Sequence, residues 1–160
     1  MTIIVENGTI VSGANSYVSE AELTAYATAR GVTLSLDTEQ LLIRAMDYIE
    51  AQIYLGYKFT STQPLQWPRS GVYVDSYLVD SDVIPTELKN GQMETALAID
   101  NGQDPLADIA RTTKSETVGS LSVTYADNAA STTLVRKISS SLKKLLANGS
   151  SGSQFNVGRG

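Results

Sequence analysis

The chain has 160 residues and a formal net charge of −5, and it contains no cysteine and no histidine. Without thiols and imidazoles it can form no disulfide, no cysteine- or histidine-ligated metal site and no histidine-dependent catalytic triad. The sequence also lacks a glycine-rich phosphate-binding loop. We therefore expect no catalytic residues, no cofactor and no metal, and hence a protein that is not an enzyme.

The length and hydropathy pattern limit the class of protein further. A chain of this size is expected to bury about 70% of the surface that it exposes when unfolded, which is enough for one domain with its own core. No apolar run approaches the roughly 18 residues of a membrane span, and the first residues lack the pattern of a secretion signal. We expect a protein made in the cytoplasm that does not contact a membrane.

Charge is distributed unevenly along the chain. Residues 111–160 hold seven basic and two acidic groups, a net charge of +5, which leaves −10 for residues 1–110. The acidic overall balance argues against a protein whose main task is to bind nucleic acid phosphates. Opposite charge at the two ends would orient copies of the chain in a head-to-tail assembly. An uneven spread of ordinary surface charge explains the same observation.

The first elements are indicated by turn and capping residues. Short apolar runs on either side of Asn7-Gly8 predict a β-ribbon, because this dipeptide is typical of tight hairpin turns. Ser19 with Glu22 forms a capping box, which predicts the start of a helix that ends at Gly31. Asp37 begins a second helix in the same way, and apolar residues then recur at helical spacing as far as Ile53.

The middle of the chain is predicted to be irregular from residue 54 to residue 82, because prolines and glycines interrupt it. Pro85 is expected in the first turn of a third helix, which Asn101-Gly102 ends. Gly91 within this helix indicates a close contact with another helix.

In the last third of the chain, the spacing of the apolar residues changes twice. Apolar and polar residues alternate toward Tyr125, which predicts a β-hairpin at about 114–126. A striped helix is expected from Thr132 to Ala147, with its lysines and arginines on the outer side. The expected fold class is mainly α, a small bundle of about four helices with a β-hairpin insertion and extended N- and C-terminal arms. We expect one domain over 1–149 and a flexible arm over 150–160.

Two acidic groupings are candidate metal or acid–base sites. Asp80 and Asp82 precede a helix, where carboxylates are stabilised by the helix dipole without any ligand. Asp100 to Asp104 resembles the start of a calcium loop, but the sixth position is not glycine and the twelfth is Arg111. Helix capping and solvated loop residues explain both groupings better.

Aromatic residues crowd the irregular segment and the end of the helix before it. Stacking of bases on aromatic rings is one way in which proteins hold single-stranded nucleic acid. The same span carries only Lys58 and Arg69 as cations, against Glu50 and Asp75, so we favour packing or a subunit interface instead. The aromatic residues are Tyr48, Tyr54, Tyr57, Phe59, Trp67, Tyr73 and Tyr77.

A series of short motifs runs along nearly the whole chain. They are Val5 to Gly8, Gly13 to Ser19, Tyr26 to Gly31, Ile43 to Ile49, Leu65 to Arg69, Ile84-Pro85, Ala96 to Ala98, Lys114 to Gly119 and Val123 to Tyr125. Their order and spacing resemble the head–tail connector or adaptor proteins of tailed bacteriophages. Some members of that group are labelled DnaT-like single-stranded-DNA-binding proteins.

The resemblance implies a structural subunit of the virion neck, made in the host cytoplasm and repeated about twelve times in a ring. Its expected partners are copies of itself, the portal protein and the tail or next neck protein, with genomic DNA passing through the lumen without specific binding. Trp67, Pro68 and Arg69 are expected to hold the irregular segment in place near a neighbouring subunit. The residues implied to contact the portal or a neighbour are Gln154, Phe155, Asn156, Val157 and Arg159.

Two other functions stay open. The alternative is a DnaT-like replication accessory protein that binds single-stranded DNA, and tight, salt-sensitive binding by the purified monomer would indicate it. The third hypothesis is a metal-dependent enzyme that uses carboxylates alone, whose activity would be lost on substitution of Asp80 or Asp82.

Overall fold

A computed structural model describes residues 2–103, 105, 115–118, 121–124, 138 and 140–147. Its long helices are α1 (Glu20–Thr28), α2 (Thr38–Glu50) and α3 (Thr86–Asp100), and residues 138 and 140–142 are also helical. Antiparallel pairs form between β1 (Tyr57–Lys58) and β2 (Arg69–Ser70), β3 (Tyr73–Val74) and β4 (Tyr77–Leu78), and β5 (Ser115–Val118) and β6 (Leu121–Thr124).

The fold is a small mixed α/β domain, so the expectation of a mainly helical bundle is correct for the helices and incomplete for the rest. The sequence pattern missed β1 to β4 because strands of two residues show no periodicity. The predicted hairpin near 114–126 is confirmed by β5 and β6, which pair in register from Ser115 with Thr124 to Val118 with Leu121.

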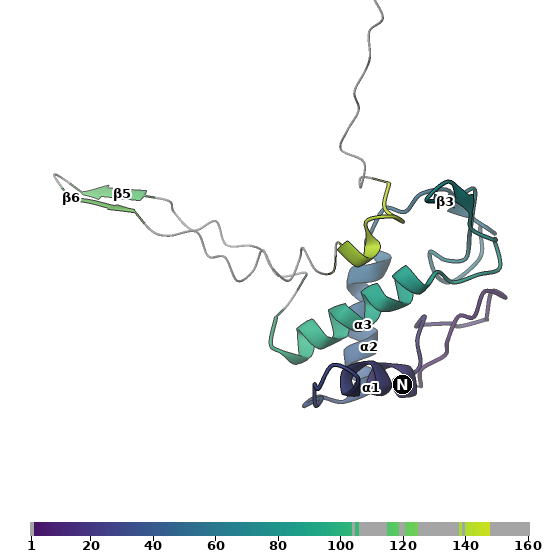
Figure 1. Cartoon of the computed structure of the whole chain (residues 1–160), viewed down its shortest axis with the longest axis horizontal. Helices are drawn as coiled ribbons and strands as arrows, with labels where there is room; N and C mark the ends of the chain where they lie inside the picture. Colours follow the sequence, from purple (N-terminus) through teal and green to yellow (C-terminus); the bar gives the residue numbers. More distant parts are fainter. Residues whose placement is uncertain are drawn as a thin grey trace, which may run out of the picture.

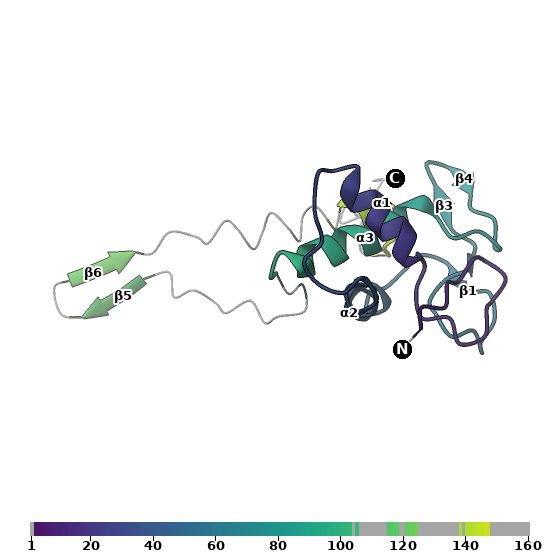
Figure 2. The same cartoon turned by 90° about the horizontal axis from the view of Figure 1, so that it is seen from below.

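The core lies between α2 and α3, which cross each other, and α1 packs against both (Figures 1 and 2). The apolar stripe of α2 is buried as its spacing predicted, including Leu42 and Ile49. One cluster joins Leu42 to α1 and the second half of α3, and another joins Ile49 to Trp67 and Leu142. Burial of each large aliphatic side chain stabilises such a core by about 1.5–3 kcal/mol.

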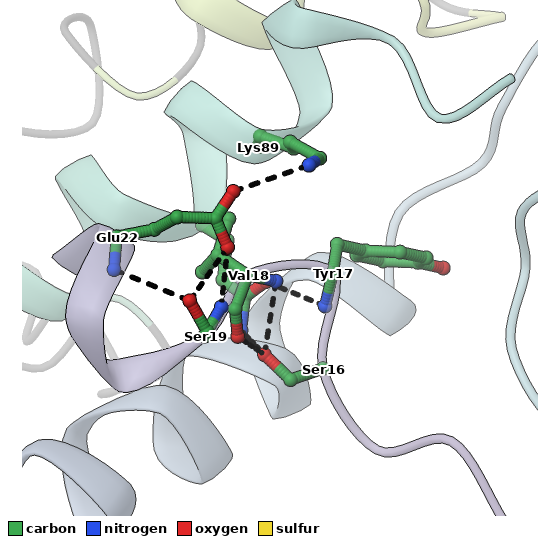
Figure 3. Close-up of polar contacts among 7 residues, drawn as sticks. Ser16, Tyr17, Val18, Ser19, Glu22 and Lys89 are labelled. Carbon is green, nitrogen blue, oxygen red and sulfur yellow. Dashed lines mark hydrogen bonds and ion pairs between the residues drawn. The ribbon is translucent and has the colours of Figure 1, made fainter. Parts of the chain in front are cut away.

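The helix starts follow the capping residues in the sequence. Glu22 N–H donates to Ser19 Oγ at 3.2 Å and Ser19 N–H donates to Glu22 Oε2 at 2.7 Å, which is the predicted capping box (Figure 3). Asp37 accepts from the backbone N–H of Gln40. Pro85 is the N-cap of α3 and not part of its first turn.

The N-terminal segment differs from the prediction, because it is neither a β-ribbon nor a free arm. Val5 forms a parallel bridge with Ser16, and the buried Glu6 carboxylate accepts from the N–H groups of Gly8, Ile10 and Val11. A side chain therefore supplies the acceptors that a partner strand would have provided. Pattern reading cannot anticipate this arrangement.

The chain before α1 is attached to α3 by one buried amide. Gln92 Oε1 accepts from the N–H of Tyr17 at 3.0 Å, and Gln92 Nε2 donates to Ser16 Oγ at 2.8 Å. On the surface nearby, Lys89 of α3 pairs with Glu22 of α1 at 3.3 Å (Figure 3). These contacts fix α1 on α3.

The C-terminal segment, residues 138 and 140–147, packs on α3 (Figure 1). Of the helix predicted from Thr132 to Ala147, the described part is helical only to residue 142. The chain then forms an antiparallel bridge between Leu146 and Tyr54, and Leu55 N–H donates to the carbonyl of Leu145 at 2.8 Å. These partners replace helical hydrogen bonds, so the helix ends early.

The C-terminal arm and a membrane-spanning segment are the two remaining features that the sequence addressed. The proposed arm over 150–160 lies outside the described residues. Within the described ranges, no helix has both the length and the apolar character needed to cross a bilayer.

Candidate functional site

Trp67, Pro68 and Arg69 lie inside the irregular segment. Trp67 is fully buried and meets the ring of Tyr54 edge-on, with centroids 5.9 Å apart, and the Trp67–Pro68 peptide bond is cis. The Arg69 guanidinium donates to the carbonyls of Leu55 at 2.7 Å and Gly56 at 2.8 Å. Burial lowers the pKa of Arg69 below its usual value. The charge of Arg69 is therefore directed at backbone carbonyls. The expected place of these three residues beside a neighbouring subunit stays a prediction.

A buried polar network attaches this segment to α2. Tyr17 O–H donates to Glu50 Oε1 at 2.5 Å and accepts from the N–H of Trp67 at 3.1 Å, while Gln66 N–H donates to Glu50 Oε2 at 2.8 Å. Burial raises the pKa of Tyr17, and it also raises the pKa of Glu50 although these donors favour its carboxylate. The network makes the irregular segment a fixed scaffold.

Four aromatic side chains on this scaffold point into solvent. Their exposed fractions lie between 52% and 79%, which is unusual for such large apolar groups. Packing explains the buried Tyr54 and Trp67, as the sequence analysis favoured, but it does not explain the exposed ones. The exposed rings are Tyr57, Phe59, Tyr73 and Tyr77.

One of these rings lies beside two lysines from the C-terminal segment. Tyr73, Lys143 and Lys144 line a groove of about 390 Å³, which we call the tyrosine–lysine groove. Both lysines are exposed. The other residues that line the groove are Leu55, Val74, Asp75 and Leu146.

Lys144 has an acidic partner within the groove. Its Nζ lies 2.5 Å from Asp75 Oδ2. The hydrogen bond and the negative charge of Asp75 raise the pKa of Lys144, and Glu87 of α3 adds to this effect. Lys144 therefore remains an ammonium at all pH values at which the protein would work.

This site is not visible in the sequence, because its cations lie far along the chain from its aromatic residues. Lys143 and Lys144 follow Tyr73 by about 70 positions, and only the docking of the C-terminal segment brings them together. The one available signal was the lysine pair on the outer side of the last predicted helix.

The other candidate sites offer fewer groups that could bind a charged ligand. A second groove of about 460 Å³, between the end of α1 and the loop before α2, is lined by threonine hydroxyls and apolar groups without a charge. Asp100 accepts from the backbone N–H groups of Ser35 and Leu36. Burial would raise the pKa of Asp100, but these donors lower it. The carboxylate thus caps a loop, as the sequence favoured.

Neither acidic grouping forms a metal site in the part of the chain that the structure covers. No group of three or more potential metal ligands gathers among the described residues, Asp80 and Asp82 included. The proposed portal contact falls outside these residues, so the structure does not place it. It comprises Gln154, Phe155, Asn156, Val157 and Arg159.

Comparison with known proteins gives one match. The family model described as "Putative DnaT-like ssDNA binding protein" matches residues 1–160. No curated protein and no solved structure matches the chain.

The match confirms the DnaT-like part of the resemblance and contradicts the head–tail connector function that we inferred from it. The hypothesis of a structural virion protein rested on the order and spacing of the short motifs, and it was wrong. The DNA-binding alternative was ranked below it because of the acidic net charge, and such an average hides local groups of cations. The ring, the portal and tail partners and the neck location all depended on that hypothesis. No finding tests them.

Proposed function

Since this chain belongs to the family of DnaT-like single-stranded-DNA-binding proteins, we propose that it binds single-stranded DNA in the tyrosine–lysine groove and catalyses no reaction. The observation that supports this proposal most directly is that the exposed Tyr73 lines the same groove as two exposed lysines. A base that stacks on an aromatic ring and a phosphate held by an ammonium are the two contacts that such proteins combine.

The walls of the groove supply both contacts at adjacent positions. Leu55, Val74 and Leu146 form apolar surface next to the Tyr73 ring, which suits the face of a base. Lys143 and Lys144 of the C-terminal segment line the same groove, where they would contact the phosphates of a bound strand. Tyr77, the first residue after the β3–β4 turn, is also exposed, but it pairs with Val74 and therefore lies on the opposite face of the hairpin from Tyr73.

The acidic net charge is compatible with this proposal because electrostatic interactions across the surface are local. The Debye length is about 10 Å at 0.1 M salt, so acidic groups farther than this from the groove are screened from it. The lysines of the groove belong to residues 111–160, which carry a net charge of +5. We expect moderate affinity and a small salt dependence.

The test is to measure the dissociation constant for a fluorescent oligothymidylate of about 16 nucleotides by anisotropy over a range of salt. Changing Lys143→Gln and Lys144→Gln together should make the slope of log affinity against log salt shallower by about 1.4, since each phosphate contact contributes about 0.7. Arg44→Gln, an exposed charge on α2, is the control and should leave the slope unchanged.

The stacking contact has a different signature. Tyr73→Ala should weaken binding by about 1–3 kcal/mol at every salt concentration without changing the slope, because a ring carries no charge. Tyr73→Phe keeps the ring and should keep the affinity. Circular dichroism would show that each variant is folded. The absence of binding by the wild-type protein at low salt, or binding that none of these changes affects, would reject the proposal.

A further inference from the structure

The carboxylate of Asp75 lies inside the same groove that we propose for DNA. Two-residue turns with positive φ at both central positions are rigid hairpin connections. Asp75 and Ser76 occupy these positions between β3 and β4, with φ of 51° and 71°. The turn thus fixes Asp75 two residues after the ring of Tyr73, and Asp75 Oδ2 accepts from Lys144 Nζ at 2.5 Å.

A carboxylate and a phosphate compete for the same kind of partner. Both are oxygen anions that accept from an ammonium at similar distances. A strand whose phosphate approached Lys144 would find one of its donors taken by Asp75, and it would be repelled by the carboxylate beside it. Asp75 is the acidic residue among those lining the groove, and Glu87 acts on Lys144 from α3.

We infer that Asp75 is a built-in competitor of the DNA phosphate: it holds Lys144 in the free protein and is separated from it when a strand binds. This inference rests on the proposed function. The residue thereby limits the affinity of the groove, so that binding of a strand needs several contacts at once and remains readily reversible. An exposed ion pair is easily exchanged, which suits this role.

Asp75→Asn tests the inference with little change to the fold. Asparagine has the shape of aspartate and adopts positive φ at least as readily, so the turn should be preserved. At about 0.1 M salt, the variant should bind the same oligothymidylate about three to ten times more tightly than the wild type. Asp47→Asn on the exposed side of α2 changes the net charge equally and should have a smaller effect.

A double-mutant cycle separates competition at Lys144 from general repulsion. In a Lys144→Gln background there is no ammonium for Asp75 to hold, and only its repulsion of the strand remains, so the gain from Asp75→Asn should be smaller than in the wild-type background. A gain that stays the same in this background would overturn the inference, because Asp75 would then act on the strand directly.

The two proposals fail in different ways. If the wild type binds and Asp75→Asn binds no better than Asp47→Asn, the competitor role is wrong and the proposed function stands. If neither the wild type nor Asp75→Asn binds, the proposed function is wrong and the inference falls with it. Binding by Asp75→Asn alone at about 0.1 M salt, with binding by the wild type only at low salt, would support both.

Discussion

Glu50 shows how a single buried group couples local chemistry to the stability of the whole protein. Its carboxylate accepts from Tyr17 and Gln66, and it thereby attaches the irregular segment to α2. Burial nevertheless raises its pKa above the usual value of 4.5. Glu22 and Asp100 have lowered pKa values, because the donors around them outweigh the effect of burial.

These shifts have opposite consequences for stability. A carboxyl group with a raised pKa in the folded state favours folding at low pH, and this contribution is lost as pH rises through the folded pKa. Groups with lowered pKa values contribute above their unfolded pKa, and that stability is lost as pH falls through the folded pKa. Glu50 therefore lowers the stability of the fold as pH rises above about 4.5, whereas the stability from Glu22 and Asp100 is lost as pH falls below their ordinary pKa values of 4.5 and 3.8.

We predict that Glu50→Gln flattens the pH dependence of the free energy of unfolding above about pH 4.5, because the charge that burial disfavours is removed. Urea denaturation at about pH 5 and about pH 8 would measure this, with the wild type less stable at the higher pH on account of this group. Asp47→Asn, an exposed carboxylate of the same helix, should retain the wild-type profile. If the free energy of unfolding of Glu50→Gln depended on pH as that of the wild type does, Glu50 would not be the group responsible.

Among the elements, α3 and the C-terminal segment meet at a point where there is no room for a side chain. A Cβ atom on Gly91 would lie 2.4 Å from Cδ2 and 2.9 Å from Cγ of Leu142. The close helix contact that Gly91 indicated in the sequence is thus present. Because Lys143 and Lys144 directly follow Leu142, this contact positions half of the tyrosine–lysine groove.

Gly91→Ala should therefore shift the C-terminal segment. Overpacking of this kind costs about 1–3 kcal/mol, part of which the higher helix propensity of alanine offsets. We expect a lower melting temperature and weaker binding of oligothymidylate, with a shallower salt slope because the lysines are displaced. Asn90→Ala, the adjacent and half-exposed position of α3, should change neither. Full DNA binding by Gly91→Ala would show that the groove does not depend on this contact.

At the scale of the whole molecule, residues from the acidic first part of the chain and from its basic last part line one groove. The aromatic wall comes from the acidic first 110 residues and the cationic wall from the basic remainder. Aromatic stacking requires an accessible base face, which a double helix does not offer. The surface is therefore suited to single strands more than to duplexes.

A competition experiment tests this preference. An unlabelled single strand should displace the labelled oligothymidylate at a concentration at least about tenfold lower than a duplex of equal length, since stacking contributes about 1–3 kcal/mol per base. The comparison must use the same salt concentration for both competitors. Equal displacement by the duplex would mean that phosphate contacts alone hold the strand.

Much of the helical framework could be read from the sequence, because its signals are local. Ser19 and Asp37 mark the starts of α1 and α2, and the apolar spacing from Leu41 to Ile49 identifies the buried face. The β5–β6 hairpin could be predicted for the same reason. The structure of the N-terminal segment could not be predicted, because the acceptors that organise it belong to the side chain of Glu6.

The sequence by itself determined the starts of α1 and α2 and the absence of thiol and imidazole chemistry, since each depends on residue types or on neighbours within a few positions. Only the tertiary structure decided which aromatic rings are exposed and which cations accompany them. Tyr73 and Lys144 line one groove because Leu142 packs on Gly91 and the carbonyl of Leu145 accepts from the N–H of Leu55. Contacts between residues so far apart in the chain depend on how the whole core packs, and no local pattern encodes them.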